Sequence, residues 1–244
     1  MQQSFRIALA AALATAAAVA LTVRAEEKPA DAGWLPLFNG KDLTGWKLHP
    51  NPNPGAIKAI TAKEEGGKVV AYTGETKDGK EVPLWTVTNG TLVGSGPATH
   101  LFSEKDDYTD FHYRVEAKIN DKGNSGQYFR TKFGPGFPQG YEAQINATHG
   151  DQIRTGSLYP SFKLTPEDRV KILVMKDAPN KADEFFVQEV IAEGNHIRIL
   201  VNGKPTIDFT DPNSSFTKGH FALQGHDPGT VVTFKKIEWK PLKK

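Results

Sequence analysis

The 244-residue sequence contains no cysteine and, after its first 25 residues, no apolar run long enough to span a membrane. Without cysteine the chain forms no disulfides, so its stability has to come from a packed core. Its aromatic residues can supply such a core, since there are 4 Trp, 14 Phe and 6 Tyr. The lack of cysteine also excludes a lipid attached at a bacterial lipobox.

Residues 26–244 also lack an excess of charge of either sign. The first 25 residues hold two basic residues, Arg6 and Arg24, and no acid. Without these two, 28 of the 30 basic residues remain, which equals the 28 acidic residues. A chain without net charge gives no indication of nucleic acid or an anionic membrane surface as a partner.

The N-terminal residues have the pattern of a secretory signal peptide. "MQQSFR" is a short basic start, residues 7–23 are an unbroken run of mostly Ala, Leu and Val, and "VRA" places small residues before a break after Ala25. We therefore predict a signal peptide over residues 1–25 and a periplasmic or secreted mature protein. An uncleaved membrane anchor is the alternative, although the run is short and rich in Ala.

Most of the remaining sequence is typical of β-strands. Asn89-Gly90 and Asn202-Gly203 each lie between two short β-type runs, which is the strongest short-range signal for a hairpin. Residues 110–120 alternate apolar and polar side chains, and only residues 165–170 resemble the start of a helix. Many short strands with frequent turns predict an all-β fold, a two-sheet antiparallel sandwich of jelly-roll type.

We expect a single domain over residues 26–244, because the sequence shows no internal repeat and no linker. Residues from about 49 to 84 are rich in Gly, Pro and charged residues and are predicted to be an inserted loop with a small hairpin. Such a segment either decorates the fold or contributes to a ligand site at the rim of the sandwich.

The segment "QGYEAQIN" (139–146) has two unlike faces when it is a strand. Tyr141, Ala143 and Ile145 fall on one side, and Glu142, Gln144 and Asn146 on the other. The polar row either faces water or lines a cleft that holds a polar ligand. These two interpretations predict different functions.

Six segments together resemble the 3-keto-disaccharide hydrolase family of exported bacterial proteins. They are "GWLPLFNGKDLTGWK" (33–47), "GNSGQYFR" (123–130), "GYEAQI" (140–145), "TGSLYP" (155–160), "IAEGNHIRILVNG" (191–203) and "LQGHDPGTVVTFKKIEWK" (223–240). The resemblance covers nearly the whole mature chain and implies a concanavalin-like sandwich that acts on sugars already oxidised at C3. Two positions depart from the family pattern. Asn146-Ala147 replaces an acid that is usual after the strand, and Phe185-Phe186 lies where a Trp-Asn pair is usual.

A ketone at C3 makes the hydrogen at C2 acidic, so the bond from C1 to the leaving group can break by elimination, after which water can add. This route requires a base near C2, donors for the enolate oxygen, and an acid or a metal near the glycosidic oxygen. Glu142 is the predicted base, and the resemblance places it with Gln144 on a sheet that lines the sugar cleft. This interpretation favours a site over a face exposed to water.

The remaining candidates come from loops and neighbouring segments. His226, beside Gln224, is the predicted proton shuttle or metal ligand. Arg130 is predicted to share a face with Asn124 and Tyr128 and either to donate to the enolate or sugar or to pair with Glu142. Asn124 is expected to order the cleft wall.

Tyr159 either stacks on a sugar ring or lies in the core. No two histidines have metal-ligand spacing, so a divalent metal would need ligands distant in sequence.

The leading hypothesis is an exported enzyme that cleaves 3-keto-glycosides, by elimination or hydrolysis, with a small-molecule sugar as its partner. A non-catalytic carbohydrate-binding module of the cell envelope is the alternative, since the same sandwich serves lectins. A structural interaction domain of the envelope is a third. The sequence leaves the oligomeric state open.

Overall fold

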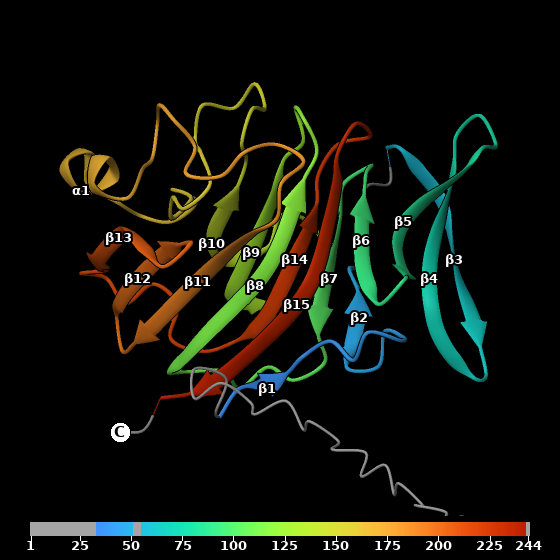
Figure 1. Cartoon of the computed structure of the whole chain (residues 1–244), viewed down its shortest axis with the longest axis horizontal. Helices are drawn as coiled ribbons and strands as arrows, with labels where there is room; N and C mark the ends of the chain where they lie inside the picture. Colours follow the sequence, from blue (N-terminus) through green and yellow to red (C-terminus); the bar gives the residue numbers. More distant parts are fainter. Residues whose placement is uncertain (1–32, 51–54, 243–244) are drawn as a thin grey trace, which may run out of the picture. The chain divides into compact units, whose positions relative to one another are not determined.

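A computed structural model describes residues 33–50 and 55–242, and the predicted signal peptide lies outside these described residues. The described chain forms two antiparallel β-sheets with one short helix (Figure 1). This confirms the predicted all-β sandwich.

The larger sheet, called sheet A here, has the strand order β13-β12-β11-β8-β15-β6-β5-β4-β3, with β1 paired to β15. Its strands are β1 (Leu35–Pro36), β3 (Ile57–Glu65), β4 (Lys68–Thr76), β5 (Glu81–Thr88), β6 (Thr91–Ser95), β8 (Phe111–Ile119), β11 (Phe186–Glu193), β12 (His196–Val201), β13 (Lys204–Thr210) and β15 (Val231–Pro241).

The smaller sheet, sheet B, has the order β10-β9-β14-β7-β2. Its strands are β2 (Trp46–Leu48), β7 (Thr99–Ser103), β9 (Ser125–Lys132), β10 (Gln139–Ile145) and β14 (His220–Gly225). Neighbours in both sheets are often far apart in sequence, as expected for a jelly roll.

Both predicted Asn-Gly hairpins form. Asn89 and Gly90 connect β5 to β6 with φ of 49° and 75°, and Asn202 and Gly203 connect β12 to β13 with φ of 51° and 73°. Positive φ at both central residues is the mark of the tight hairpin turn that suits twisted strands. These turns set the register of both hairpins.

Alternating side chains divide each strand between two environments. On β10, Tyr141, Ala143 and Ile145 are fully buried and belong to the main hydrophobic core, which also contains alternate residues of β8 from sheet A. The opposite face of sheet B carries a separate small apolar cluster of Phe102, Tyr128 and Ala222. The candidate site lies on this second face.

The segment from about 49 to 84 has more regular structure than the predicted loop. Beyond residues 51–54, which are not described, it contains β3, β4 and the first half of β5, which continue sheet A at one edge. The turn between β3 and β4, at Gly66-Gly67, matches the small hairpin that the sequence predicts.

The helix signal at residues 165–170 is confirmed as α1 (Pro166–Lys171), where the side chain of Thr165 accepts a bond from the Asp168 backbone. In the described part of the chain, no helix has the length and hydropathy needed to cross a bilayer.

Candidate active site

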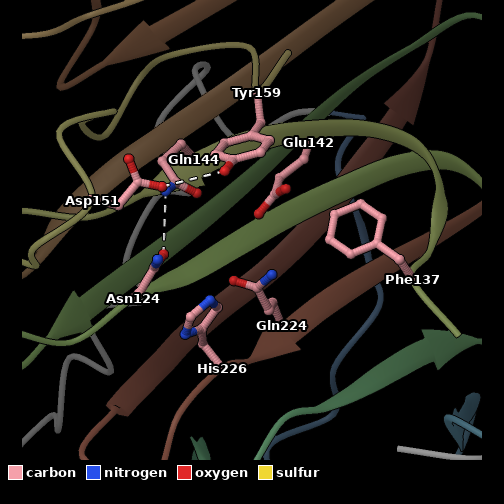
Figure 2. A pocket seen from close by; sticks show the side chains of 8 residues that line it. All are labelled: Asn124, Phe137, Glu142, Gln144, Asp151, Tyr159, Gln224 and His226. Carbon is pink, nitrogen blue, oxygen red and sulfur yellow. Dashed lines mark hydrogen bonds between the residues drawn. The ribbon is translucent and has the colours of Figure 1, made fainter. Parts of the chain in front are cut away.

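A hollow lies on the face of sheet B that points away from the main core. Figure 2 shows eight side chains that converge on it, from β10, β14 and the loops around them. Six of them are residues that the sequence analysis singled out: Asn124, Glu142, Gln144, Tyr159, Gln224 and His226. The other two are Phe137 and Asp151. The polar row of β10 therefore lines a pocket rather than facing open water.

The strand register explains why residues from different strands meet here. On β10, Glu142 pairs with Tyr128 of β9, and Gln144 pairs with Gly126. Paired residues of adjacent antiparallel strands point to the same face, about 5 Å apart. Glycine at position 126 leaves the space that the Glu142 carboxyl group occupies, because a Cβ there would overlap it.

Glu142 is the most perturbed acid of the pocket. Its side chain is almost completely buried, and burial raises its pKa to about 8. A hydrogen bond from the Tyr128 hydroxyl lowers the pKa in part, and the negative charge of Asp151 adds to the rise. A carboxyl group whose pKa lies near neutral pH can both take up and release a proton under physiological conditions.

Tyr128 connects Glu142 to a second pocket residue. Its hydroxyl accepts a hydrogen bond from Gln224 Nε2 at 3.2 Å and bonds to Glu142. Burial and the adjacent carboxylate hold the pKa of Tyr128 well above its usual value. The phenol therefore stays protonated and donates to Glu142.

The amides of Asn124 and Gln144 form one wall of the pocket. Gln144 Nε2 lies 3.2 Å from Asn124 Oδ1, which is one of the dashed contacts in Figure 2. Turning the Gln144 amide over would place its nitrogen 3.1 Å from the Ser125 carbonyl oxygen and 3.3 Å from Glu142 Oε1. In that orientation the amide supports the ionised form of Glu142, since an N–H donor favours a carboxylate.

Asp151 and Tyr159 also line the pocket, beside Gln144 (Figure 2). The Tyr159 hydroxyl lies 3.3 Å from Asp151 Oδ2, and burial followed by the Asp151 charge raises the pKa of the phenol. Tyr159 is half-buried and lines the pocket, so it is not a core residue.

Asn146 organises the loop that carries Asp151. Its Nδ2 donates to the carbonyl oxygens of Asp151 and Ile153, and its Oδ1 accepts from the His149 backbone N–H. The residue that replaces the acid usual in the family is thus a buried amide that shapes a loop. At the second departure, Phe186 lies in the core and Phe185 is exposed.

His226 lies in a cluster with Asp227 and His149, in which it is hydrogen-bonded to Asp227. His226 Nδ1 lies 3.0 Å from Asp227 Oδ2, and His149 Nε2 lies 3.5 Å from the same oxygen. Burial opposes ionisation of Asp227, but bonds from His226 and the Gly229 N–H outweigh it and lower the pKa of the acid. The Asp227 carboxylate therefore holds a proton on His226 Nδ1, which leaves Nε2 as the nitrogen free to exchange a proton.

These three residues are also the group in the described chain that could hold a metal ion, since their ligand atoms lie within 4.8 Å of one another. The bonding of His149 bears on that role. Its Nδ1 lies 3.0 Å from the donating backbone N–H of Asp151, so the ring proton sits on Nε2 and points at Asp227. A metal ion bound through His149 Nε2 would use the lone pair of that nitrogen, so the ring proton would have to move to Nδ1. Nδ1 could then no longer accept the hydrogen bond from the Asp151 N–H.

Arg130 does not reach the pocket, which corrects the prediction that it shares a face with Asn124 and Tyr128. Its φ of 49° interrupts the alternation of β9, so its side chain turns toward one end of the sandwich. There the guanidinium donates to the carbonyl oxygens of Thr109, Gly194 and Phe216. Its acidic partner is Asp110 at 3.4 Å, not Glu142. Arg130 is placed to hold three chain segments together.

Several residues in the pocket or bonded to its lining escaped the sequence analysis: Phe137, Asp151, His149, Asp227, and Tyr128 as a partner of Glu142. Asp227 could have been found, because an acid adjacent to a candidate histidine is a common orienting partner. His149 and Asp151 are brought in by a loop after β10, and no spacing in the sequence indicates that loop's path.

Comparisons with known proteins agree with this fold. A sequence model of a domain described as 3-keto-alpha-glucoside-1,2-lyase-like matches residues 33–240. Two solved structures of proposed glycosyl hydrolases from Parabacteroides distasonis are similar. One has 22% identity and a TM-score of 0.56 over 86% of this chain and 94% of that one. The other has 19% identity and a TM-score of 0.54 over 86% and 99%.

A third structure, described as a native glycosidic hydrolase, has 13% identity and a TM-score of 0.54 over 86% of this chain and 95% of its own. A search of curated proteins found no match.

Proposed function

Because this chain belongs to the family of 3-keto-alpha-glucoside-1,2-lyase-like domains, we propose that it is an enzyme that cleaves 3-keto-glycosides after removing the proton at C2. Membership of the family makes it a carbohydrate-active, glycosyl hydrolase-like protein. The proposed removal of the C2 proton is supported by the environment of Glu142. This residue is a buried carboxyl group with a pKa of about 8, and it lines a polar pocket.

In the first step the Glu142 carboxylate takes the proton from C2. The electron pair of that C–H bond is delocalised onto the C3 ketone as an enolate. The amides of Asn124 and Gln144 on the pocket wall are the neutral donors suited to the enolate oxygen. Since the pKa of Glu142 is about 8, about one tenth of the molecules carry the carboxylate at pH 7.

In the second step the enolate collapses, the C1–O bond breaks and a C1=C2 double bond forms. The leaving oxygen needs a proton, which His226 donates from Nε2 while Asp227 stabilises the imidazolium through Nδ1. The products are an unsaturated 3-keto sugar and the released sugar or alcohol.

The net reaction is hydrolysis if water adds to the C1=C2 double bond before the unsaturated 3-keto sugar leaves the pocket. Glu142, after its proton has exchanged with solvent, returns a proton to C2, and hydroxide adds to C1 as His226 takes a proton from the water. The same two residues thus serve elimination and hydration, so both outcomes are compatible with one pocket.

The test is incubation of the protein with 3-keto-trehalose while glucose release is followed. Release is expected with the 3-keto sugar and not with trehalose itself, because only the ketone makes the C2 hydrogen acidic. A sugar-binding module would bind without releasing glucose. Repeating the reaction with a chelator shows whether the group of His149, His226 and Asp227 needs a metal ion.

We also propose that the protein acts in the periplasm or outside the cell, on the basis of the leader-like residues 1–25. N-terminal sequencing of the protein from an expressing bacterium should begin at Glu26. Intact Met1 in soluble, cytoplasmic protein would refute export.

A further inference from the structure

A second hollow lies between two loop segments, residues 147–154 after β10 and residues 176–182 before β11. Arg154 lines it from the first segment, and Lys176 and Asn180 line it from the second. The Arg154 backbone N–H donates to the carbonyl oxygen of Val174 at 2.8 Å, which holds the two parts of the chain side by side. No residue lines both this hollow and the pocket around Glu142, so the two are separate features.

The guanidinium group of Arg154 has only uncharged partners. Its Nη1 donates to the carbonyl oxygens of His149 and Asp151, both at 2.8 Å, and to Asn146 Oδ1 at 3.2 Å. In the part of the chain that the structure describes, no carboxylate pairs with Arg154, and its Nε and Nη2 have no acceptor. These two nitrogens form one edge of the guanidinium, whose parallel N–H groups match the two oxygens of a carboxylate.

Lysine side chains add positive charge around the hollow. Lys176 is exposed and has no ion-pair partner among the described residues, whereas Lys181 pairs with Glu184 at 3.5 Å. With Arg154, three basic side chains line the described part of the hollow, against one acid, Asp177. The hollow therefore favours an anion over a neutral or cationic ligand.

Asn180 contributes a buried amide that makes no hydrogen bond. The residue is 8% exposed, and neither Oδ1 nor Nδ2 has a partner among the described residues. Leaving both atoms without partners is costly. Neighbouring atoms cover the amide, but turning it into the hollow breaks no hydrogen bond, because it has none to lose. There it can both donate and accept, which suits a hydroxyl group.

We propose that this hollow binds a small anion that carries a carboxylate and hydroxyl groups, which is the chemistry of a sugar acid. The carboxylate accepts from Nε and Nη2 of Arg154 and lies near Lys176, and a hydroxyl group of the ligand bonds to Asn180. The small side chains of Ala178 and Ala182, which pack against the main core, leave room for the sugar ring. The proposal does not depend on the proposed function, because the hollow lies outside the first pocket.

The ligand also bears on the loop that contributes to the first pocket. Arg154 already holds the carbonyl oxygens of His149 and Asp151 through Nη1, and a carboxylate at its other edge would fix the same guanidinium. Binding in the hollow is therefore expected to slow the opening of residues 147–154, and backbone hydrogen exchange measures such opening.

The test is calorimetric titration with D-glucuronate, D-glucose and inorganic phosphate in Tris chloride at constant ionic strength. D-Glucose has a similar ring without the carboxylate, and phosphate has the charge without the hydroxyl-bearing ring. Lys176→Gln and Asn180→Ala each remove one proposed contact. Lys77→Gln is the matched control, since Lys77 is an exposed lysine between β4 and β5 that does not line the hollow.

We expect D-glucuronate to bind with a Kd of order 1 mM, as a few hydrogen bonds to a small ligand allow, and glucose and phosphate to bind about tenfold more weakly or less. For glucuronate, Asn180→Ala should weaken binding by about fivefold to tenfold and Lys176→Gln by about twofold to fivefold. Lys77→Gln should leave the affinity unchanged. Because Lys176 is exposed and without an ion-pair partner, its substitution tests the site even if Asn180→Ala is less stable.

Equal affinity for glucuronate and glucose would overturn the proposal, and so would phosphate binding as tightly as glucuronate, since charge alone would then explain the binding. An affinity for glucuronate that neither substitution changes would place the anion elsewhere and have the same consequence. Hydrogen exchange should slow in residues 147–154 and 176–182 when glucuronate is added. Slowing confined to β10 and β14 would place the ligand in the first pocket and contradict the proposal.

Discussion

The raised pKa of Glu142 predicts an unusual dependence of stability on pH. The pKa of Glu142 in the folded protein is about 8, whereas that of an unperturbed Glu is 4.5. Between these values the folded protein binds more protons than the unfolded chain, so this residue's contribution is fully present below pH 4.5 and is lost as pH rises toward 8. At about 1.4 kcal/mol per pH unit, the loss from pH 5 to pH 8 is of order 3 kcal/mol.

Glu142→Gln removes the titration and keeps the shape of the side chain. The difference in melting temperature between the variant and the unsubstituted protein should therefore grow in favour of the variant as pH rises. For a domain of this size, about 3 kcal/mol corresponds to roughly 6–12 °C. Over the same range the variant should lose roughly 10²–10⁴-fold of its turnover of a 3-keto-glycoside, as expected for a missing base.

The assay is a set of thermal unfolding curves between pH 5 and pH 9 for both proteins. Glu65→Gln, at an exposed position of β3, makes the same side-chain substitution at a surface carboxylate and serves as the control. Parallel curves for the Glu142→Gln variant and the unsubstituted protein would refute the raised pKa. Near-normal turnover would remove Glu142 from the catalytic group.

Four further predictions follow from the same pocket. Gly126→Ala places a Cβ where the Glu142 carboxyl group lies, so turnover should fall by about tenfold or more, which steady-state kinetics will show. Asp227→Asn removes the acceptor of His226 Nδ1 and should lower turnover by about 10–100-fold, with a changed pH profile. Arg130→Met removes a buried cation that holds three carbonyl oxygens, so unfolding in urea should show a loss of about 3 kcal/mol, while turnover per folded molecule stays within about twofold. For the unsubstituted protein, kcat/KM should rise with pH through a midpoint near pH 8, as the base form of Glu142 accumulates.

The sequence predicts the fold well because short-range signals determine it. Asn-Gly pairs at positions 89–90 and 202–203 specify tight turns, and strict alternation over residues 111–119 specifies a strand with one buried face. The same alternation along β10 separates Glu142 and Gln144 from the core residues. Alternation therefore places both side chains on the face away from the core, and the family resemblance predicts that this face lines a cleft.

Alternation fails where the backbone leaves the strand conformation. Arg130 is two residues beyond Tyr128 and would share its face on a regular strand, but its left-handed φ of 49° turns it away. Nothing in the sequence predicts this, because Arg is a rare residue in that conformation. Residues such as His149 and Asp151 lie in a loop whose path depends on long-range packing and on the buried amide of Asn146.

The central claim is that the reaction begins with removal of the proton at C2, and deuterium at that carbon tests it most directly. The protein is incubated with 3-keto-trehalose in D₂O, and the recovered substrate and products are analysed by nuclear magnetic resonance against samples without protein and with the Glu142→Gln variant. The account predicts deuterium at C2 of the hydrated product in the presence of the unsubstituted protein, and a slower reaction when C2 carries deuterium from the start. Glucose release with protium fully retained at C2 and no isotope effect would contradict it, because bond cleavage would then proceed without the C2 proton.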